Sequence, residues 1–249
     1  MTVPERAPLG AALALLLAVV SLTGPLSPLL MACCLALLAV LIGVAWPGLL
    51  ELPSAAGTRV VVAGTGVLGA LVTVLAPERI SPVSGIVMVC AAGVFASFVQ
   101  QMARTERRDL TTSLTGTVAG VFVAAIAACW IVAQGTAVDS GTTGLVTSVS
   151  AGLAATLLLN ATPLPSLPRF VLSAVVGAGV SAVLAVTLVG LGPALSAAVG
   201  LVTAIGASCA QLLTGSSLVA KEPVPSLGVA AVPVATVGVV AHLVVVLLP

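Results

Sequence analysis

Charged side chains, the first candidates for chemistry, are concentrated in one short stretch of this sequence. The stretch Arg104–Asp109 (RTERRD) separates two long apolar runs. Basic residues beside a membrane attract anionic lipid headgroups, by about 1 kcal/mol each, or act as solvated anchors that fix the side of the bilayer. Two other basic residues, Arg169 and Lys221, lie in proline-containing segments. We predict contacts with lipid headgroups or a protein partner at Arg104, Arg107, Arg108, Arg169 and Lys221.

Polar side chains within the apolar runs are the second candidates. Ionisable groups inside a bilayer are costly and usually mark function, yet no Asp, Glu, Lys or Arg lies well inside an apolar run. The polar exceptions are Gln100, Gln101, Gln134, Asn160, Gln211 and His242. We predict intramembrane polar contacts at Asn160, Gln211 and His242; a hydrogen bond across helices contributes roughly 0.6–2 kcal/mol. Because the glutamines lie near predicted helix ends, we expect a headgroup environment around them.

Catalytic and metal-binding motifs are not evident. The five cysteines lie in apolar runs without the CxxC and histidine pattern of a zinc or redox site, so we expect them to act as small apolar side chains. The sequence lacks a Walker-type loop, an HExxH motif and a Ser-His-Asp combination. It therefore predicts no catalytic residue, no metal site and no cofactor, and we expect a protein that is not an enzyme.

The composition is typical of a membrane protein. Apolar residues make up 60% of the chain and charged residues 6%, with a mean hydropathy of +1.32, whereas soluble domains carry roughly 25% charged residues. Windows of about 20 apolar residues recur along the whole length. We predict one all-α membrane domain covering residues 1–249. The net charge of +1 and the lack of a polybasic tail argue against a nucleic-acid partner.

Nine apolar segments are expected to cross the plasma membrane, at about residues 9–22, 28–46, 60–75, 82–102, 114–134, 144–161, 170–188, 193–213 and 228–248. We expect Pro47 to close the second segment and a polar turn to occupy residues 135–143. With the N-terminus cytoplasmic and the C-terminus outside, seven of the eight basic residues would be cytoplasmic, as the positive-inside rule requires. These seven are Arg6, Arg59, Arg104, Arg107, Arg108, Arg169 and Lys221.

Small residues indicate how the helices pack. Gly116 and Gly120 form a small-xxx-small pair, a pattern that allows close approach between helices in lipid. The abundance of Ala, Val, Leu and Gly, with a single lysine, is typical of a bacterial genome of high GC content.

Three short stretches, in this order along the chain, carry a resemblance. Residues 108–113 read RDLTTS, residues 211–221 read QLLTGSSLVAK, and residues 228–234 read GVAAVPV. Their order and the helix layout resemble the bacterial phosphatidate cytidylyltransferase (CDP-diacylglycerol synthase) family. That family has an Arg-Asp-Val-Thr-Ala-Ser helix entry, a Glu-Ser-x-x-Lys-Arg-Asp segment and a last helix beginning Asp-Ser-Leu-Leu-x-x-Ala-Pro. The resemblance implies a polytopic helical fold and a place in lipid metabolism.

The departures from the family pattern concern its reactive residues. Ser150-Ala151-Gly152 stands where the family has a Ser-Asp pair, and residues 223–227 replace its histidine-glycine segment. Lys221 alone matches the catalytic signature. The resemblance therefore implies a degenerate, inactive relative without the acidic residues that hold metal in the family.

These observations favour a non-catalytic multi-pass membrane protein that acts as a subunit, scaffold or lipid-contacting component of envelope or lipid metabolism. Its expected partners are membrane lipids and possible membrane or cytoplasmic proteins. One alternative is a permease for a small neutral or amphiphilic solute, suggested by the glycines, the Ser and Thr residues and the prolines between segments. An active lipid cytidylyltransferase-like enzyme is the other.

Overall fold

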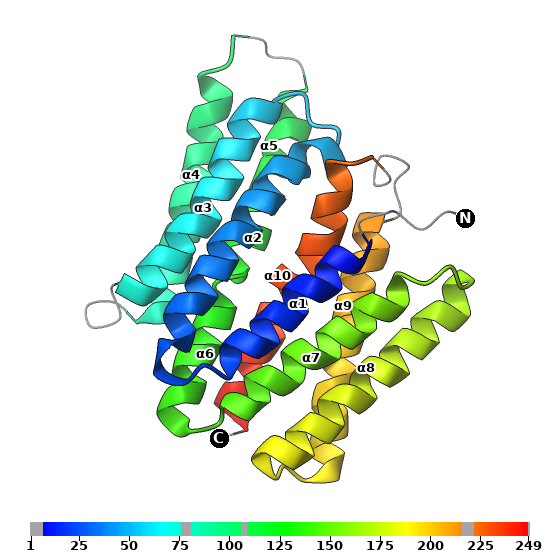
Figure 1. The fold of residues 1–249 in the computed structure, drawn as a ribbon. Coiled ribbons are helices and arrows are strands. Elements are labelled where there is room, and N and C mark those ends of the chain that lie inside the picture. Colours follow the sequence, from blue (N-terminus) through cyan, green and yellow to red (C-terminus); the bar gives the residue numbers. More distant parts are fainter. Residues whose placement is uncertain (1–6, 76–80, 106–108, 216–221, 249) are drawn as a thin grey trace.

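The computed structural model describes residues 7–75, 81–105, 109–215 and 222–248, and in these residues every regular element is a helix. The expected all-α fold is thus confirmed for this part of the chain. The elements are α1 (Ala7–Ser21), the 3-10 helix η1 (Gly24–Leu26), α2 (Ser27–Leu49), α3 (Ala55–Leu75), α4 (Pro82–Met102), α5 (Leu110–Ile126), α6 (Cys129–Ser140), α7 (Thr143–Asn160), α8 (Ser166–Val189), α9 (Pro193–Gly215) and α10 (Pro225–Leu247) (Figure 1).

In the described part of the chain, eight helical segments are long and apolar enough to cross a membrane. They are α2, α3, α4, the combined α5–α6 segment, α7, α8, α9 and α10. The architecture is therefore that of a multi-pass membrane protein. Helix α1 has 15 residues, a length of about 22 Å at 1.5 Å per residue, which is shorter than the roughly 30 Å hydrocarbon core. The predicted ninth span and the sidedness stay predictions.

Two predicted C-terminal helix ends are wrong by three or more residues. Helix α2 continues through Pro47 to Leu49, because a proline in the last turn removes only one hydrogen bond of the helix. The polar turn expected at residues 135–143 is mostly helix α6, which ends at Ser140 and is capped by Gly141 with a φ of +72°. Thr142 N–H donates to the Ala137 carbonyl at 2.8 Å, the long hydrogen bond of a glycine-based helix end.

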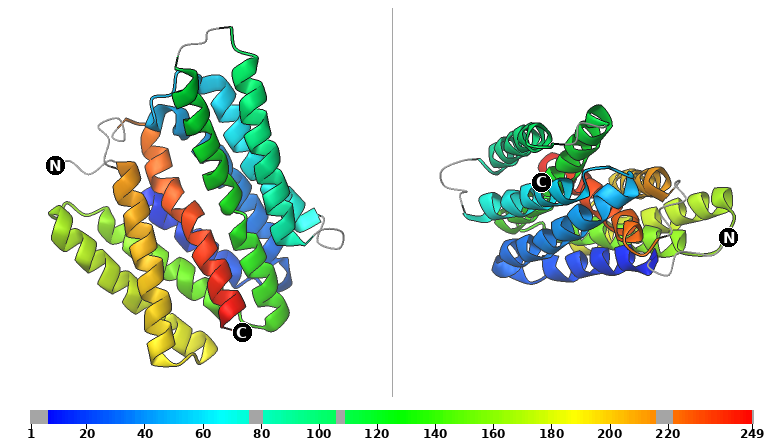
Figure 2. Two further views of the ribbon diagram at one scale, coloured as in Figure 1. Left: turned by 180° about the vertical axis from the view of Figure 1, so that it is seen from behind. Right: turned by 90° about the horizontal axis from the view of Figure 1, so that it is seen from above.

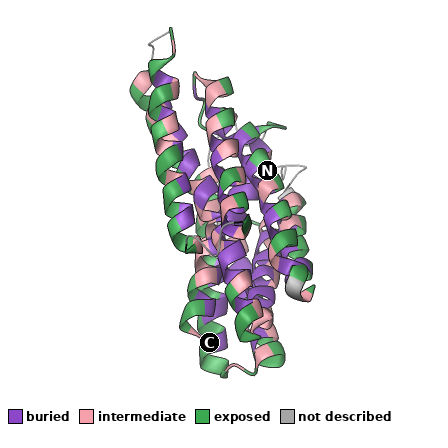
Figure 3. Cartoon of the chain, turned by 90° about the vertical axis from the view of Figure 1, so that its left-hand side faces the viewer, coloured by how far each residue is buried: buried purple, intermediate pink, exposed green. Residues whose placement is uncertain are grey.

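Helix α10 occupies the centre of the bundle, in contact with α1, α2, α5, α6, α7 and α9 (Figures 1 and 2). Within the most apolar windows, 61% of α10 is buried, against 28% of α4 and 33% of α8 and of α9. These three peripheral helices present large apolar side chains outward, such as Phe95, which is 70% exposed, and Val175, which is 60% exposed. Figure 3 shows the side of the bundle that carries α4, with its exposed residues in green. Such outward apolar faces suit contact with lipid.

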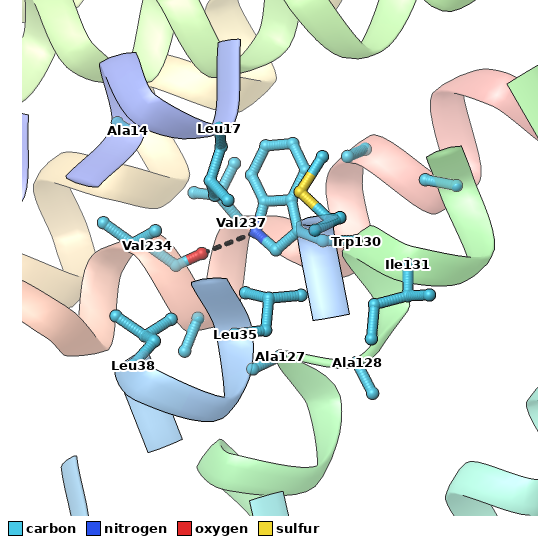
Figure 4. Close-up of a cluster of buried hydrophobic side chains, with 14 of the residues drawn as sticks. Ala14, Leu17, Leu35, Leu38, Ala127, Ala128, Trp130, Ile131, Val234 and Val237 are labelled. Atoms are coloured by element: carbon cyan, nitrogen blue, oxygen red, sulfur yellow. Dashed lines mark hydrogen bonds between the residues drawn. The ribbon is translucent and has the colours of Figure 1, made fainter. Parts of the chain in front are cut away.

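Trp130 of α6 lies in the middle of the apolar core (Figure 4). Its side chain is fully buried, with Leu17 and Leu35 among the buried side chains of the same cluster. The indole Nε1 donates a 2.8 Å hydrogen bond to the Val234 carbonyl of α10, which satisfies the polar atom of an otherwise apolar side chain. The α6–α10 contact is therefore fixed by both packing and a directional bond.

The other tryptophan of the chain, Trp46, is held in the same way. Its Nε1 donates to the Gly116 carbonyl of α5 at 2.8 Å, and Gly120, one turn later, leaves room for the indole. The predicted Gly116–Gly120 pair thus receives a tryptophan and the side chain of Leu52. The close approach at this pair is therefore between α5 and the side chains of Trp46 and Leu52, and not between two helix backbones.

Candidate functional site

The described basic residues belong to three helix ends: Arg59 is near the start of α3, Arg104 follows the end of α4, and Arg169 is near the start of α8. These three helix ends lie toward the same end of the bundle as the start of α1 (Figure 1). This end is formed by the α2–α3, α4–α5, α7–α8 and α9–α10 connections. It also carries the acidic residues Glu51, Asp109 and Glu222. At the opposite end, the described residues include one charged side chain, that of Asp139. The predicted contact residues Arg107, Arg108 and Lys221 lie outside the described residues.

Arg104 belongs to a hydrogen-bonded network at the C-terminal end of α4. Its Nη1 donates to Gln101 Oε1 at 2.9 Å. Gln101 Nε2 in turn donates to Ser113 Oγ of α5 at 2.8 Å and to Gln100 Oε1 at 3.0 Å. Gln100 Nε2 donates to the hydroxyl of Ser54, which precedes α3. The network orients a half-buried arginine and joins three parts of the chain at the charged end.

Buried hydroxyls extend this network toward the core. Thr117 Oγ1 donates to the Ser113 carbonyl at 2.7 Å and lies 2.8 Å from Thr58 Oγ1 of α3. Both threonines are fully buried. Helices α3, α4 and α5 are therefore linked by polar side chains beneath Arg104, and the cost of burying those groups is offset by their hydrogen bonds.

An apolar groove lies beside the network, between α3 and α4. It has a volume of about 650 Å³, within the roughly 300–1,000 Å³ of typical small-molecule sites. Its lining is apolar apart from the side chain of Gln100. The groove is open on the outer face of the bundle, because Val60 is 73% exposed and Phe95 is 70% exposed. The lining residues are Ala56, Gly57, Val60, Val61, Phe95, Ala96, Val99, Gln100 and Ala103.

The predicted intramembrane polar residues do not meet at one site. Asn160 Nδ2 of α7 lies 3.5 Å from Ser208 Oγ of α9, at the limit of hydrogen-bonding distance. Gln211 lies one turn further along α9, and its buried Oε1 has no hydrogen-bond partner among the described residues. His242 lies near the other end of the bundle, on α10, and its Nδ1 likewise has no described partner. The structure therefore separates His242 from the Asn160–Gln211 region.

Gln134 is a polar site that the sequence reasoning misplaced. The expected headgroup environment is wrong, because the Gln134 side chain is fully buried. Its Nε2 donates to the Ser21 carbonyl at 3.0 Å and to Ser27 Oγ at 2.7 Å, while Ser21 Oγ lies 2.6 Å from Thr147 Oγ1. The amide thus joins the end of α1 to the start of α2. The sequence feature that could have indicated this polar site is a serine on each side of the Gly24-Pro25 turn.

Gln101 also departs from the expected headgroup environment, because only 7% of its surface is exposed. Neighbouring helices cover both of these helix ends, so position near the end of an apolar run does not place a glutamine in water.

Several hydroxyls of α7 and α9 bond to carbonyls of their own helices. Ser150 Oγ donates to the Val146 carbonyl at 2.7 Å, and Thr203 Oγ1 donates to the Val199 carbonyl at 2.8 Å. These bonds use the hydroxyl protons within the helices and leave the oxygens as acceptors. Among the described residues, no group of three or more His, Cys, Asp or Glu side chains is arranged to hold a metal ion.

Comparisons with protein-family models, with curated proteins and with solved structures find no match to this chain. The resemblance to phosphatidate cytidylyltransferases rests on helix layout and three short stretches, and it stays a prediction. The described geometry is the basis for the functional conclusion.

Proposed function

We propose that this chain is a non-catalytic, multi-pass plasma-membrane protein that contacts anionic phospholipid headgroups and serves as a scaffold or subunit in envelope or lipid metabolism. The observation that carries the proposal is the network that orients Arg104 at the charged end of the bundle. A nine-span arrangement with a cytoplasmic N-terminus belongs to the proposal. It would direct the charged end toward the leaflet whose anionic lipids attract basic residues.

Because Arg104 is held in position by a hydrogen bond, we favour specific binding of a lipid phosphate over general anchoring of the protein at the membrane surface. A free arginine on a membrane surface loses side-chain entropy when it pairs with a phosphate. The hydrogen bond to Gln101 limits this loss in advance, and the guanidinium retains further donors for a phosphate oxygen. Its acceptor among the described residues is a neutral amide, so this contact leaves the positive charge of the guanidinium uncompensated.

The missing acidic residues support a non-catalytic role. Metal-dependent transfer of a nucleotide needs carboxylates to hold magnesium, and Ser150-Ala151-Gly152 stands where the resembled family has an acidic residue. In the structure Ser150 is fully buried and donates to its own helix. The hydroxyl proton at this position is therefore used within α7.

Extraction of the tagged protein in polymer nanodiscs, with its native lipid, tests the proposal. Quantitative proteomics and lipid analysis would compare the native chain with the R104Q/R107Q/R108Q variant and with R79Q, a charge control predicted to lie on the other side. We expect a near-stoichiometric protein partner and enriched anionic phospholipid, both lost in the triple variant and kept in R79Q. Recovery of the native chain alone, with the lipid composition of the bulk membrane, would show that the proposal is wrong.

A further inference from the structure

The groove between α3 and α4 combines an apolar wall with a charged end. Val60 and Val61 of α3 face Phe95 and Val99 of α4 across it. Its open side is on the outer surface of the bundle, where these apolar side chains would meet lipid tails. The groove has a volume of about 650 Å³ and is an open furrow, not an enclosed cavity.

The polar end of the groove is the Arg104 network. Gln100 lines the groove and bonds to Gln101, which holds Arg104. Arg104 directly follows Ala103, another lining residue, and the exposed Arg59 directly precedes Val60. Each of these two basic residues is therefore the sequence neighbour of a lining residue, Arg104 on the α4 side and Arg59 on the α3 side.

We propose that this groove binds one acyl chain of an anionic membrane phospholipid, with the lipid phosphate at Arg104. The inference deepens the proposed function and rests on it. An acyl chain matches the apolar lining, and a phosphate matches a guanidinium whose described hydrogen-bond acceptor is an amide. Zwitterionic lipids would bind less well, because their net charge is zero.

Quenching of tryptophan fluorescence by brominated lipids tests the site in proteoliposomes. The reporter is F95W, on the groove wall, while the native Trp46 and Trp130 are 6% and 0% exposed and are shielded from lipid. A second reporter, L172W, lies on the exposed face of α8 near Arg169. Competition between brominated phosphatidylglycerol and phosphatidylcholine gives the relative affinity of the anionic lipid at each position.

Two pairs of substitutions in the F95W background separate the headgroup from the acyl chain. R104Q removes the proposed phosphate contact, and R169Q removes the same charge at a distance from the groove. A96F fills the groove, and A197F adds the same bulk to the exposed face of α9. We expect about fivefold preference for the anionic lipid at F95W, given the contribution of one basic residue. R104Q and A96F should abolish it, and R169Q and A197F should retain it.

The two reporters distinguish failure of the groove from failure of the function. Anionic preference at L172W without preference at F95W, or preference at F95W unaffected by R104Q and A96F, would overturn the groove assignment and leave the proposed function standing. If neither reporter shows a preference for the anionic lipid when every arginine is native, both proposals are wrong. If quenching at F95W falls as the protein-to-lipid ratio rises, a second copy covers the groove and the lipid assignment is wrong.

Discussion

Trp130 and Gly238 form a matched pair across the α6–α10 interface. A Cβ atom on Gly238 would lie 2.8 Å from Cδ1 of the indole and 3.1 Å from its Nε1. The same indole donates to the carbonyl of Val234, one turn before the glycine. The glycine therefore allows the tryptophan to reach the backbone that it bonds. Trp46 repeats this relationship with the Gly116 carbonyl and Gly120.

Substitution of Gly238 by alanine should destabilise the protein. The added methyl group would overlap Trp130, and overpacking of this kind typically costs about 1–3 kcal/mol. Gly206→Ala is the matched control, because a Cβ there meets no atom within 4 Å and alanine has the higher helix propensity. We expect a lower Tm for G238A and an equal or higher Tm for G206A, measured by thermal unfolding in detergent. Equal Tm values for G238A and the native chain would contradict the steric account.

Removal of the Gln134 amide should also destabilise the bundle. Gln134→Leu deletes the donor to the Ser21 carbonyl and to Ser27 Oγ, and a buried group left without its partner costs about 1–3 kcal/mol. Thr115→Val is the control, since Thr115 is exposed and bonds within its own helix, so its effect should stay within about 0.5 kcal/mol. Unfolding in a denaturing detergent titration measures both. Similar free energies for the two variants would rule out a structural role for this amide.

The Gln101–Ser113 hydrogen bond should be detectable as an energetic coupling. A double-mutant cycle with Gln101→Leu and Ser113→Ala isolates this bond, and hydrogen bonds between membrane helices average about 0.6 kcal/mol, with a maximum near 1.7. We expect coupling in that range from the free energies of unfolding. A parallel cycle pairing Q101L with T115V should give none. Equal coupling in the two cycles would mean that the measured term does not come from this bond.

The sidedness of the bundle can be measured with single cysteines in a cysteine-free background. Thr105 follows α4 at the charged end, and the exposed Ser140 ends α6 at the other. With the charged end cytoplasmic, a membrane-impermeant maleimide should label S140C in intact cells, and T105C only after permeabilisation. The reverse pattern would place the charged end outside and refute the proposed orientation.

Much of the helical layout follows from local sequence. The predicted segment 82–102 coincides with α4 (Pro82–Met102), because Ser81 and Pro82 form a strong helix start. Ser81 Oγ accepts from Ser84 N–H at 3.3 Å, and proline suits the first turn. Segment 193–213 likewise differs from α9 by only two residues at its end. Apolar length and start signals are local properties, so the sequence reveals them.

The division between α5 and α6 has no such local signal. It falls at Ala127 and Ala128, where the chain has neither glycine nor proline. Trp130 N–H bonds to the Ala127 carbonyl, three residues earlier, instead of continuing the α-helical pattern. The tight turn accompanies the seating of the Trp130 indole on α10. Tertiary packing therefore sets this boundary. Because the chain turns tightly here, the buried residues of α5 and those of α6 do not follow one continuous helical period.

The candidate site could be predicted only in part. Its basic residue Arg104 was evident, because charge in an apolar sequence is easily seen. The partners of Arg104 were not, since the Gln101–Ser113 bond depends on how α4 and α5 pack against each other. The groove has no sequence signal either, because its valines and alanines resemble those of any lipid-facing helix.

The central position of α10 has a consequence for biogenesis. Every helix that α10 contacts precedes it in the chain, so the ribosome delivers the middle of the bundle after its surroundings. Until α10 inserts, the Trp130 indole lacks its acceptor on Val234, and the neighbouring helices face a vacant centre. We therefore expect the earlier helices to complete their packing only after α10 has inserted. A chain interrupted before residue 225 would present that unfinished interior to membrane quality control.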